Sequence, residues 1–243
     1  MKHLKTFICV SLLLSALSCT KNQTEGSGQV TFEVSGNWDV TEVTKTNVSD
    51  FTTLPQAADF TITITDASSA QVWTGNVSEW DPATTLVAGT YTVAASYGSV
   101  NEEGFNKPCF LGTQEFTVVG GETTSVNVSV SLANTIIKIA TSQYFDRYYT
   151  DYTLKFTRDG NDVVTFTKGE TRAAFVDGYK ITLEGTLTSE TRTQTFTQEY
   201  TNLLEATAYT LSLDVANVGG STLTITFNDT LETVELEDYE LND

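Results

Sequence analysis

The chain has 243 residues with 31 acidic side chains against 13 Lys and Arg, and its formal net charge at pH 7 is −18. So large an acidic excess repels phosphates, which argues against a nucleic-acid partner and against lying flat on an anionic membrane. The chain has only one histidine, His3, and three cysteines, Cys9, Cys19 and Cys109. So few of these residues make histidine-based catalysis, zinc sites and disulfides improbable.

Residues 1–18 have the layout of a secretory signal peptide. Lys2 and Lys5 form a basic head, and an apolar run follows that is too short to span a membrane. The run ends in Ala16-Leu17-Ser18-Cys19, which resembles the lipobox of bacterial lipoproteins, in which the cysteine is acylated and becomes the first mature residue. We therefore expect a membrane anchor at Cys19; an ordinary signal peptide with an incidental cysteine is the alternative.

Cleavage before Cys19 changes the inventory of reactive groups. It removes 18 of the 243 residues, takes away His3 and Cys9, and lowers the net charge to −20 because Lys2 and Lys5 leave without any acid. Cys109 is then the only free thiol, and its apolar neighbours favour a small buried group over a reactive one. The sequence predicts no enzyme, no catalytic residue, no cofactor and no metal site.

From residue 29 onward the hydrophobic pattern has a period of two. Residues 19–28 are polar and read as a lipidated, flexible tether. After them, apolar and aromatic residues alternate with threonines and other polar residues, as in strands with one buried face. The clearest runs lie at residues 30–34, 60–64, 91–97 and 126–132. The chain is therefore predicted to be all-β.

The second part of the chain repeats the order of the first. Five segments match in sequence order: 60–66 with 152–158, 72–73 with 163–164, 89–93 with 178–181, 113–117 with 193–197, and 126–130 with 209–213. This repetition predicts two tandem β-sandwich domains of the immunoglobulin or transthyretin kind, at residues 29–133 and 134–243. The second domain ends in an acidic segment that forms one further strand or two, the first at residues 223–227, and this segment either completes that domain or pairs elsewhere.

Only aromatic side chains suggest a ligand site. Glu79 and Asp81 flank Trp80 as a carboxylate pair would in a sugar site, although solvated acids in a loop before Pro82 are the favoured explanation. Trp38 and Trp80 both fall in predicted loops, where they could stack on a sugar ring. Residues 159–162, Asp-Gly-Asn-Asp, are of the types found in calcium-binding loops, but they match a hairpin turn better.

Several short sequence segments resemble those of a known protein family. They are the lipobox, residues 86–95, 108–112 and 116–124, the strand at 126–132 followed by Ala133-Asn134, and residues 223–229. Together they resemble a family of Bacteroidetes lipoproteins carrying a domain of unknown function, and more distantly the fimbrillin-like surface proteins. The resemblance covers nearly all of the mature chain. Its motifs are turn glycines and strand alternation, so it points to the family and says little about the activity.

These observations predict a non-enzymatic, membrane-anchored lipoprotein of the cell envelope, at the outer membrane with its face left open, acting in adhesion or fimbria-like surface assembly. The strand at residues 223–227 is the expected contact for a protein partner. The alternative is a glycan-binding lipoprotein of a polysaccharide-uptake system, acting through Trp38 and Trp80.

Overall fold

A computed structural model describes residues 26–41, 46–215, 222–227 and 230–235. Within these residues the chain is almost entirely β, and its one α-helix is the short α1 (Gln143–Tyr148). The predicted signal peptide lies outside the described residues. The all-β prediction is confirmed.

The first half of the chain, residues 27–132, builds one seven-stranded sheet. Its strand order is β5-β4-β7-β9-β10-β1-β6, and a separate two-stranded ribbon follows β1. The strands of the sheet are β1 (Ser27–Asn37), β4 (Thr61–Asp66), β5 (Gln71–Asn76), β6 (Thr85–Val87), β7 (Gly89–Tyr97), β9 (Phe110–Val118) and β10 (Thr123–Leu132), and those of the ribbon are β2 (Asp39–Val40) and β3 (Thr46–Asn47).

The second half, residues 135–235, forms two sheets. One has the order β13-β12-β15-β16, and the other β19-β18-β17-β11-β14-β8. Their strands are β11 (Thr135–Thr141), β12 (Asp151–Arg158), β13 (Asn161–Thr167), β14 (Ala174–Val176), β15 (Lys180–Thr188), β16 (Thr193–Thr201), β17 (Ala208–Val215), β18 (Thr222–Phe227) and β19 (Thr230–Glu235). The sixth strand of the second sheet, β8 (Gly104–Phe105), comes from the first half of the chain.

Matched segments of the two halves pair in the same way. In the first half β1 runs parallel to β10 and antiparallel to β6, and in the second half β11 runs parallel to β17 and antiparallel to β14. The chain β5-β4-β7-β9 has its counterpart in β13-β12-β15-β16. The sequence repeat is thus a repeat of strand pairing, and β18 and β19 have no counterpart among the described strands of the first half.

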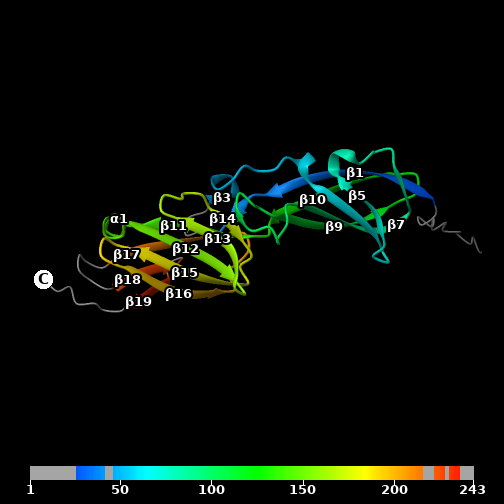
Figure 1. Ribbon diagram of the computed structural model, residues 1–243. Helices are drawn as coiled ribbons and strands as arrows, with labels where there is room; N and C mark the ends of the chain where they lie inside the picture. Colours follow the sequence, from blue (N-terminus) through cyan, green and yellow to red (C-terminus); the bar gives the residue numbers. More distant parts are fainter. Residues whose placement is uncertain (1–25, 42–45, 216–221, 228–229, 236–243) are drawn as a thin grey trace, which may run out of the picture.

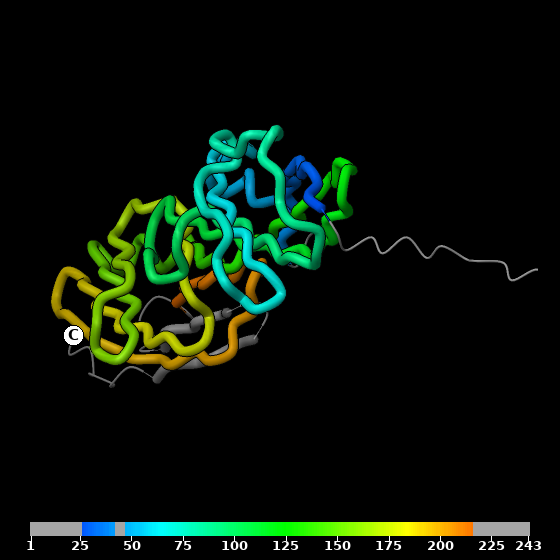
Figure 2. Tube along the Cα trace, turned by 90° about the vertical axis from the view of Figure 1, so that its right-hand side faces the viewer, coloured from blue at the N-terminus to red at the C-terminus, as the bar shows by residue number. Residues whose placement is uncertain are grey.

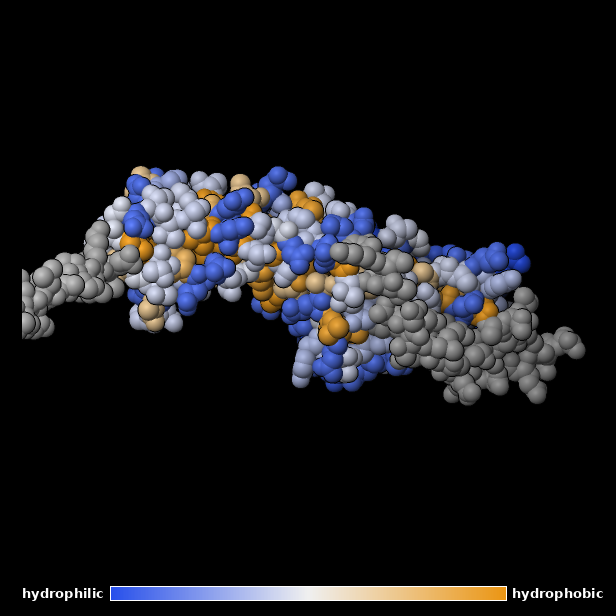
Figure 3. Space-filling view, turned by 180° about the vertical axis from the view of Figure 1, so that it is seen from behind, coloured by the Kyte–Doolittle hydropathy of each residue, from blue (hydrophilic) through white to orange (hydrophobic). Residues whose placement is uncertain are grey.

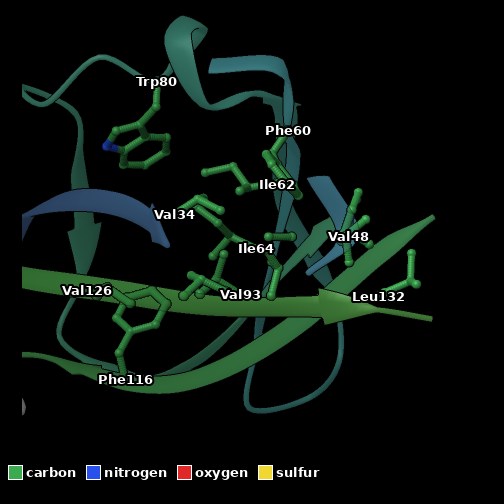
Figure 4. Packing of buried hydrophobic residues seen from close by; sticks show 14 of the residues in the cluster. Val34, Val48, Phe60, Ile62, Ile64, Trp80, Val93, Phe116, Val126 and Leu132 are labelled. Atoms are coloured by element: carbon green, nitrogen blue, oxygen red, sulfur yellow. The ribbon is translucent and has the colours of Figure 1, made fainter. Parts of the chain in front are cut away.

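Two hydrophobic clusters hold the sheets together. Alternate residues of β4 and β10 are buried, including Ile62 and Ile64 of β4, as period-two patterning requires. Figure 4 shows side chains from β4, β7 and β10 converging in the first cluster. The second cluster is rich in aromatic residues such as Phe156 and Phe166. Burying each of these large side chains stabilises the fold by about 1.5–3 kcal/mol before entropy is counted.

The molecule is elongated, with the halves arranged end to end (Figure 1). β1 begins at the tip of the first half, whereas β18 and β19 lie at the far end of the second half. A view turned by 90° shows two bodies in contact (Figure 2). Packing continues across the junction, because Ile136, Phe175 and Ala208 of the second half belong to the first cluster.

The start of β1 corrects the expected tether. β1 begins at Ser27, so Ser27 and Gly28 lie in a strand rather than in a flexible segment, paired with Val87 and Leu86 of β6. A Cβ added at Gly28 would come within 2.4 Å of the Val119 carbonyl oxygen. Gly28 therefore allows the backbone of β1 to lie close to the backbone at Val119, and it does not make the segment flexible.

Candidate functional site

The expected lipidation residue, Cys19, lies outside the described residues, so acylation stays a prediction. Among the residues that are described, no helix is both long enough and apolar enough to cross a membrane. What the structure does place is the first strand after the predicted anchor, β1, at one tip of the molecule (Figure 1).

Trp80 belongs to the first hydrophobic cluster, with 7% of its surface exposed. Its indole N–H donates a 2.8 Å hydrogen bond to the Val30 carbonyl. Phe32 and Trp73 meet its ring edge-to-face, each with centroids 5.2 Å away. Figure 4 shows the indole lying over the core side chains. Trp80 therefore has no open face for a sugar, and the expectation of a stacking role for it is wrong.

Trp38 lies at the other end of β1. Its ring covers Gly36 and meets Phe110 edge-to-face, with centroids 5.1 Å apart. Gly36 is six residues from Val30, which accepts the Trp80 bond, and six residues of strand span about 20 Å. The two tryptophans therefore do not form one platform, and the glycan alternative loses the pair through which it was expected to act.

The acidic residues near Trp80 shape local turns. The Glu79 carboxylate accepts a hydrogen bond from the Asn76 amide at 3.0 Å, and Asp81 accepts one from the Ala83 amide at 2.8 Å. Within the described residues, no group of three His, Cys, Asp or Glu side chains is placed to hold a metal ion. The loop explanation of Glu79 and Asp81 fits these contacts.

The segment at residues 159–162 is a hairpin turn between β12 and β13. Asp159 and Gly160 both have positive φ, at 50° and 79°. Two successive left-handed residues are typical of a tight hairpin connection. The turn interpretation is confirmed.

Cys109 is buried, as its neighbours predict. Burial, and secondarily the charge of Glu205, raises the pKa of its thiol, which disfavours the nucleophilic thiolate. The backbone on either side of this residue is bonded to the connection between the halves: the Cys109 amide donates to Asn134 Oδ1, and the Ala133 amide donates to the Cys109 carbonyl at 2.8 Å. Cys109 therefore contributes to the packing and backbone bonding of the junction between the halves.

A cavity of about 520 Å³ opens beside α1, between β11 and the β13–β14 loop. Two of its charged lining groups already have partners. Lys168 Nζ donates to the carbonyls of Tyr149 and Thr150 at 3.0 and 3.1 Å, and Glu170 is paired with Arg172 at 2.7 Å. These contacts hold the surrounding loops together and point to no particular ligand.

Apolar side chains on the surface are scattered. On the face shown in Figure 3, polar residues cover most of the surface and apolar residues appear between them in short strips. The large exposed apolar residues of the described chain come from separate strands and loops: Val72, Val87, Val100, Leu111, Tyr144, Tyr179 and Leu204. A broad apolar patch is therefore not the feature that defines a partner site.

The C-terminal strands bear on the predicted protein contact. The tail contains two strands, and β18 is bonded to β17 on one side and to β19 on the other. Both edges of β18 are thus occupied within the chain. β19 is the outermost strand of its sheet, so its outer row of backbone groups faces away from the other five strands. Among the described residues, 230–235 rather than 223–227 form an outermost strand of this sheet, and a contact with a partner there stays a prediction.

Comparison with solved structures finds similar chains at low sequence identity. A Bacteroides thetaiotaomicron structure described as a candidate polysaccharide-binding protein has 10% identity and a TM-score of 0.48, covering 86% of this chain and 98% of that one. A candidate adhesin from the same organism has 10% identity and a TM-score of 0.43, with 88% and 98% covered. A Parabacteroides distasonis fimbrial assembly protein has 10% identity and a TM-score of 0.45, with 87% and 98% covered.

A search of curated proteins found no match. The sequence model of the family described as "Domain of unknown function (DUF4493)" matches residues 26–241. That range contains every residue the structure describes, from the start of β1 to the end of β19. The predicted membership of a family carrying a domain of unknown function is confirmed, and this chain belongs to the DUF4493 family.

Proposed function

We propose that this chain is a non-enzymatic lipoprotein of the cell envelope, anchored to the outer membrane by an acylated Cys19, that acts in adhesion or surface assembly. Its contact with a protein partner is the open edge of β19. The observation that carries the proposal is the separation of the two ends: the chain enters the fold at one tip of the molecule, and β19 lies at the other (Figure 1).

This geometry suits a projecting protein. An anchor ahead of Ser27 attaches the tip of the first half to the membrane and directs the second half away from it. The strongly acidic composition keeps such a body from collapsing onto an anionic membrane surface. The far end is then the part best placed to meet a neighbouring copy or another surface.

An outermost strand offers a specific means of association. A strand edge presents alternating N–H and C=O groups, and a second strand can add to it with main-chain hydrogen bonds. Natural edges are often guarded by charge, and Glu232 and Glu235 stand in β19. The acids disfavour pairing with a second β19, so the partner edge, on another copy of the chain or on another protein, is one of lower negative charge.

Proline at adjacent positions of β19 tests this mechanism. Consecutive N–H groups of a strand point to opposite sides, so one of the amides of Glu232 and Thr233 faces β18 and the other faces the open edge. Proline removes the N–H donor. We expect one of the variants Glu232→Pro and Thr233→Pro to lower the melting temperature, and the other to keep it but to abolish self-association in sedimentation velocity and fibres in electron micrographs.

The matched controls are Glu232→Ala and Thr233→Ala, which retain the backbone amide and should still associate. If the proline variant of wild-type stability assembles as the wild type does, β19 is not the contact. A wild-type chain that stays monomeric at all concentrations and forms no fibres also contradicts self-assembly through this edge.

A further inference from the structure

The segment at residues 99–109 crosses from one half of the molecule to the other. It leaves the first sheet after β7 and returns to it at the start of β9. In between, Gly104 and Phe105 form β8 and pair with Phe175 and Ala174 of β14. The first half thereby supplies the outermost strand of a second-half sheet.

A shielded ion pair joins this segment to the second half. The Glu103 carboxylate pairs with the Arg158 guanidinium, and the two side chains are 12% and 22% exposed. Glu103 also accepts a 2.6 Å hydrogen bond from the Asp177 amide. Arg158 in turn donates to the carbonyls of Asp177 and Lys180. Because the charges are hydrogen-bonded on several sides, this pair is stronger than an isolated surface salt bridge.

An aromatic side chain adds an apolar contact beside the ion pair. Phe105 meets Phe166 edge-to-face, with centroids 5.0 Å apart, and packs on the second hydrophobic cluster. The guanidinium of Arg172 lies over the Phe105 ring, 4.5 Å from its centroid. Arg172 is held there by Glu170. Phe105 therefore contacts both an aromatic ring and a cation of the second half.

The backbone of the segment is adapted to this path. Gly104 is buried and has a φ of +120°, a conformation that residues with side chains rarely adopt. At the end of the segment, Cys109 bonds to Asn134 and Ala133 in the connection between the halves. The segment is thus secured both at its turning point and at its return.

We propose that residues 99–109 form an intramolecular clasp that closes the β14 edge of the six-stranded sheet. β14 consists of Ala174, Phe175 and Val176, all fully buried, and without β8 this apolar strand would be an outermost strand. Such an edge is a template for unwanted pairing with other chains. With β8 in place, the two outermost strands of that sheet among the described residues are β19 and the two-residue β8.

The clasp is tested by amide hydrogen exchange on the full chain, resolved residue by residue by NMR. The test variant is the double substitution Glu103→Gln and Phe105→Ala. Lys107→Ala is the matched control, because Lys107 lies in the same segment but its ion pair, with Glu102, stays within the first half. Of the Ala174 and Phe175 amides, one faces β8 and its neighbour faces β11.

In the double variant we expect the β8-facing amide of β14 to exchange about tenfold faster or more, while the β11-facing amide keeps its protection. The Lys107→Ala control should match the wild type at both positions. Unchanged exchange at β14 in the double variant would overturn the clasp. A loss of protection spread over the whole second half would overturn it as well, because the segment would then be an integral part of that fold.

Discussion

At the scale of single residues, Arg172 is a surface side chain whose guanidinium is held in one position by a neighbouring carboxylate. Its side chain is 54% exposed, and an exposed ion pair by itself is worth about 0–1 kcal/mol. Arg172 differs because Glu170 bonds it through both carboxylate oxygens, at 3.0 and 2.7 Å. This two-point contact fixes the plane of the guanidinium over Phe105. Glu170 therefore acts on Phe105 through Arg172.

This arrangement predicts an acid-dependent step. Hydrogen bonds from the Arg172 side chain and backbone lower the pKa of Glu170 from 4.5 to about 2. A carboxyl whose pKa is lowered on folding stabilises the protein fully above its unfolded pKa, and that contribution is lost as the pH falls from about 4.5 toward 2. We expect the Glu170 carboxyl carbon to titrate near pH 2 by NMR, with the Phe105 ring signals changing over the same range.

The Glu170→Gln variant is the control for this titration, because it carries no charge at any pH. Its Phe105 signals should be independent of pH between 4.5 and 2 and should resemble those of the acid form of the wild type. A Glu170 carboxyl that titrates near 4.5 would contradict the ion pair.

Residue roles were predictable from the sequence only where a pattern surrounds the residue. The alternation of β4 predicted that Ile62 and Ile64 are buried, and both are. Trp80 stands outside any alternating run, in a turn before Pro82, and its burial depends on an acceptor at Val30, 50 positions earlier. A contact between residues so far apart in the chain leaves no pattern in the sequence around Trp80. The expectation that the Trp80 side chain is exposed was therefore wrong.

At the scale of elements, strands were predictable and their partners were not. Period-two patterning found β4, β7 and β10, because a half-buried strand shows its faces in its own sequence. β8 has two residues and exists through pairing with β14 alone. The helix α1 has six residues, which is less than two turns, so a helical period cannot develop in it. Its start is set by Ser142, whose hydroxyl accepts from the Phe145 amide.

Glycine substitutions test how closely β1 is packed. A Cβ at Gly28 would lie 2.4 Å from the Val119 carbonyl oxygen and 2.8 Å from that of Glu122. We expect Gly28→Ala to lower the free energy of unfolding by about 1–3 kcal/mol, because backbone atoms must move. The measurement is chemical denaturation of the full chain.

Gly89→Ala is the matched control for this experiment. A Cβ there meets nothing nearer than 3.9 Å, so alanine should change the free energy of unfolding by no more than about 1 kcal/mol, and in the stabilising direction. Equal losses at Gly28 and Gly89 would show that close approach at the start of β1 is not what the glycine provides.

At the scale of the whole molecule, the repeat and the arrangement of the halves have different origins. Matching segments predicted the repeat, and the second half repeats most of the strand pairing of the first half; the pairing of β9 with β10 has no counterpart, because β16 and β17 lie in different sheets. The orientation of the halves depends on contacts between distant positions, such as the parallel bridge of Thr41 with Thr207 and the pairing of β8 with β14. Neither has a signature in sequence, since both join irregular or very short segments.

Accessibility on living cells is the prediction that belongs to this scale. If Cys19 anchors the chain in the outer leaflet, the far end of the molecule projects from the cell, and added protease should remove the C-terminal epitope from intact cells. A periplasmic marker protein must stay intact in the same sample. The Cys19→Ala variant should leave the membrane fraction, because the acyl chains that hold the protein there are missing. An epitope that stays protected until the outer membrane is broken would place the protein in the periplasm, and adhesion would then give way to a role inside the envelope.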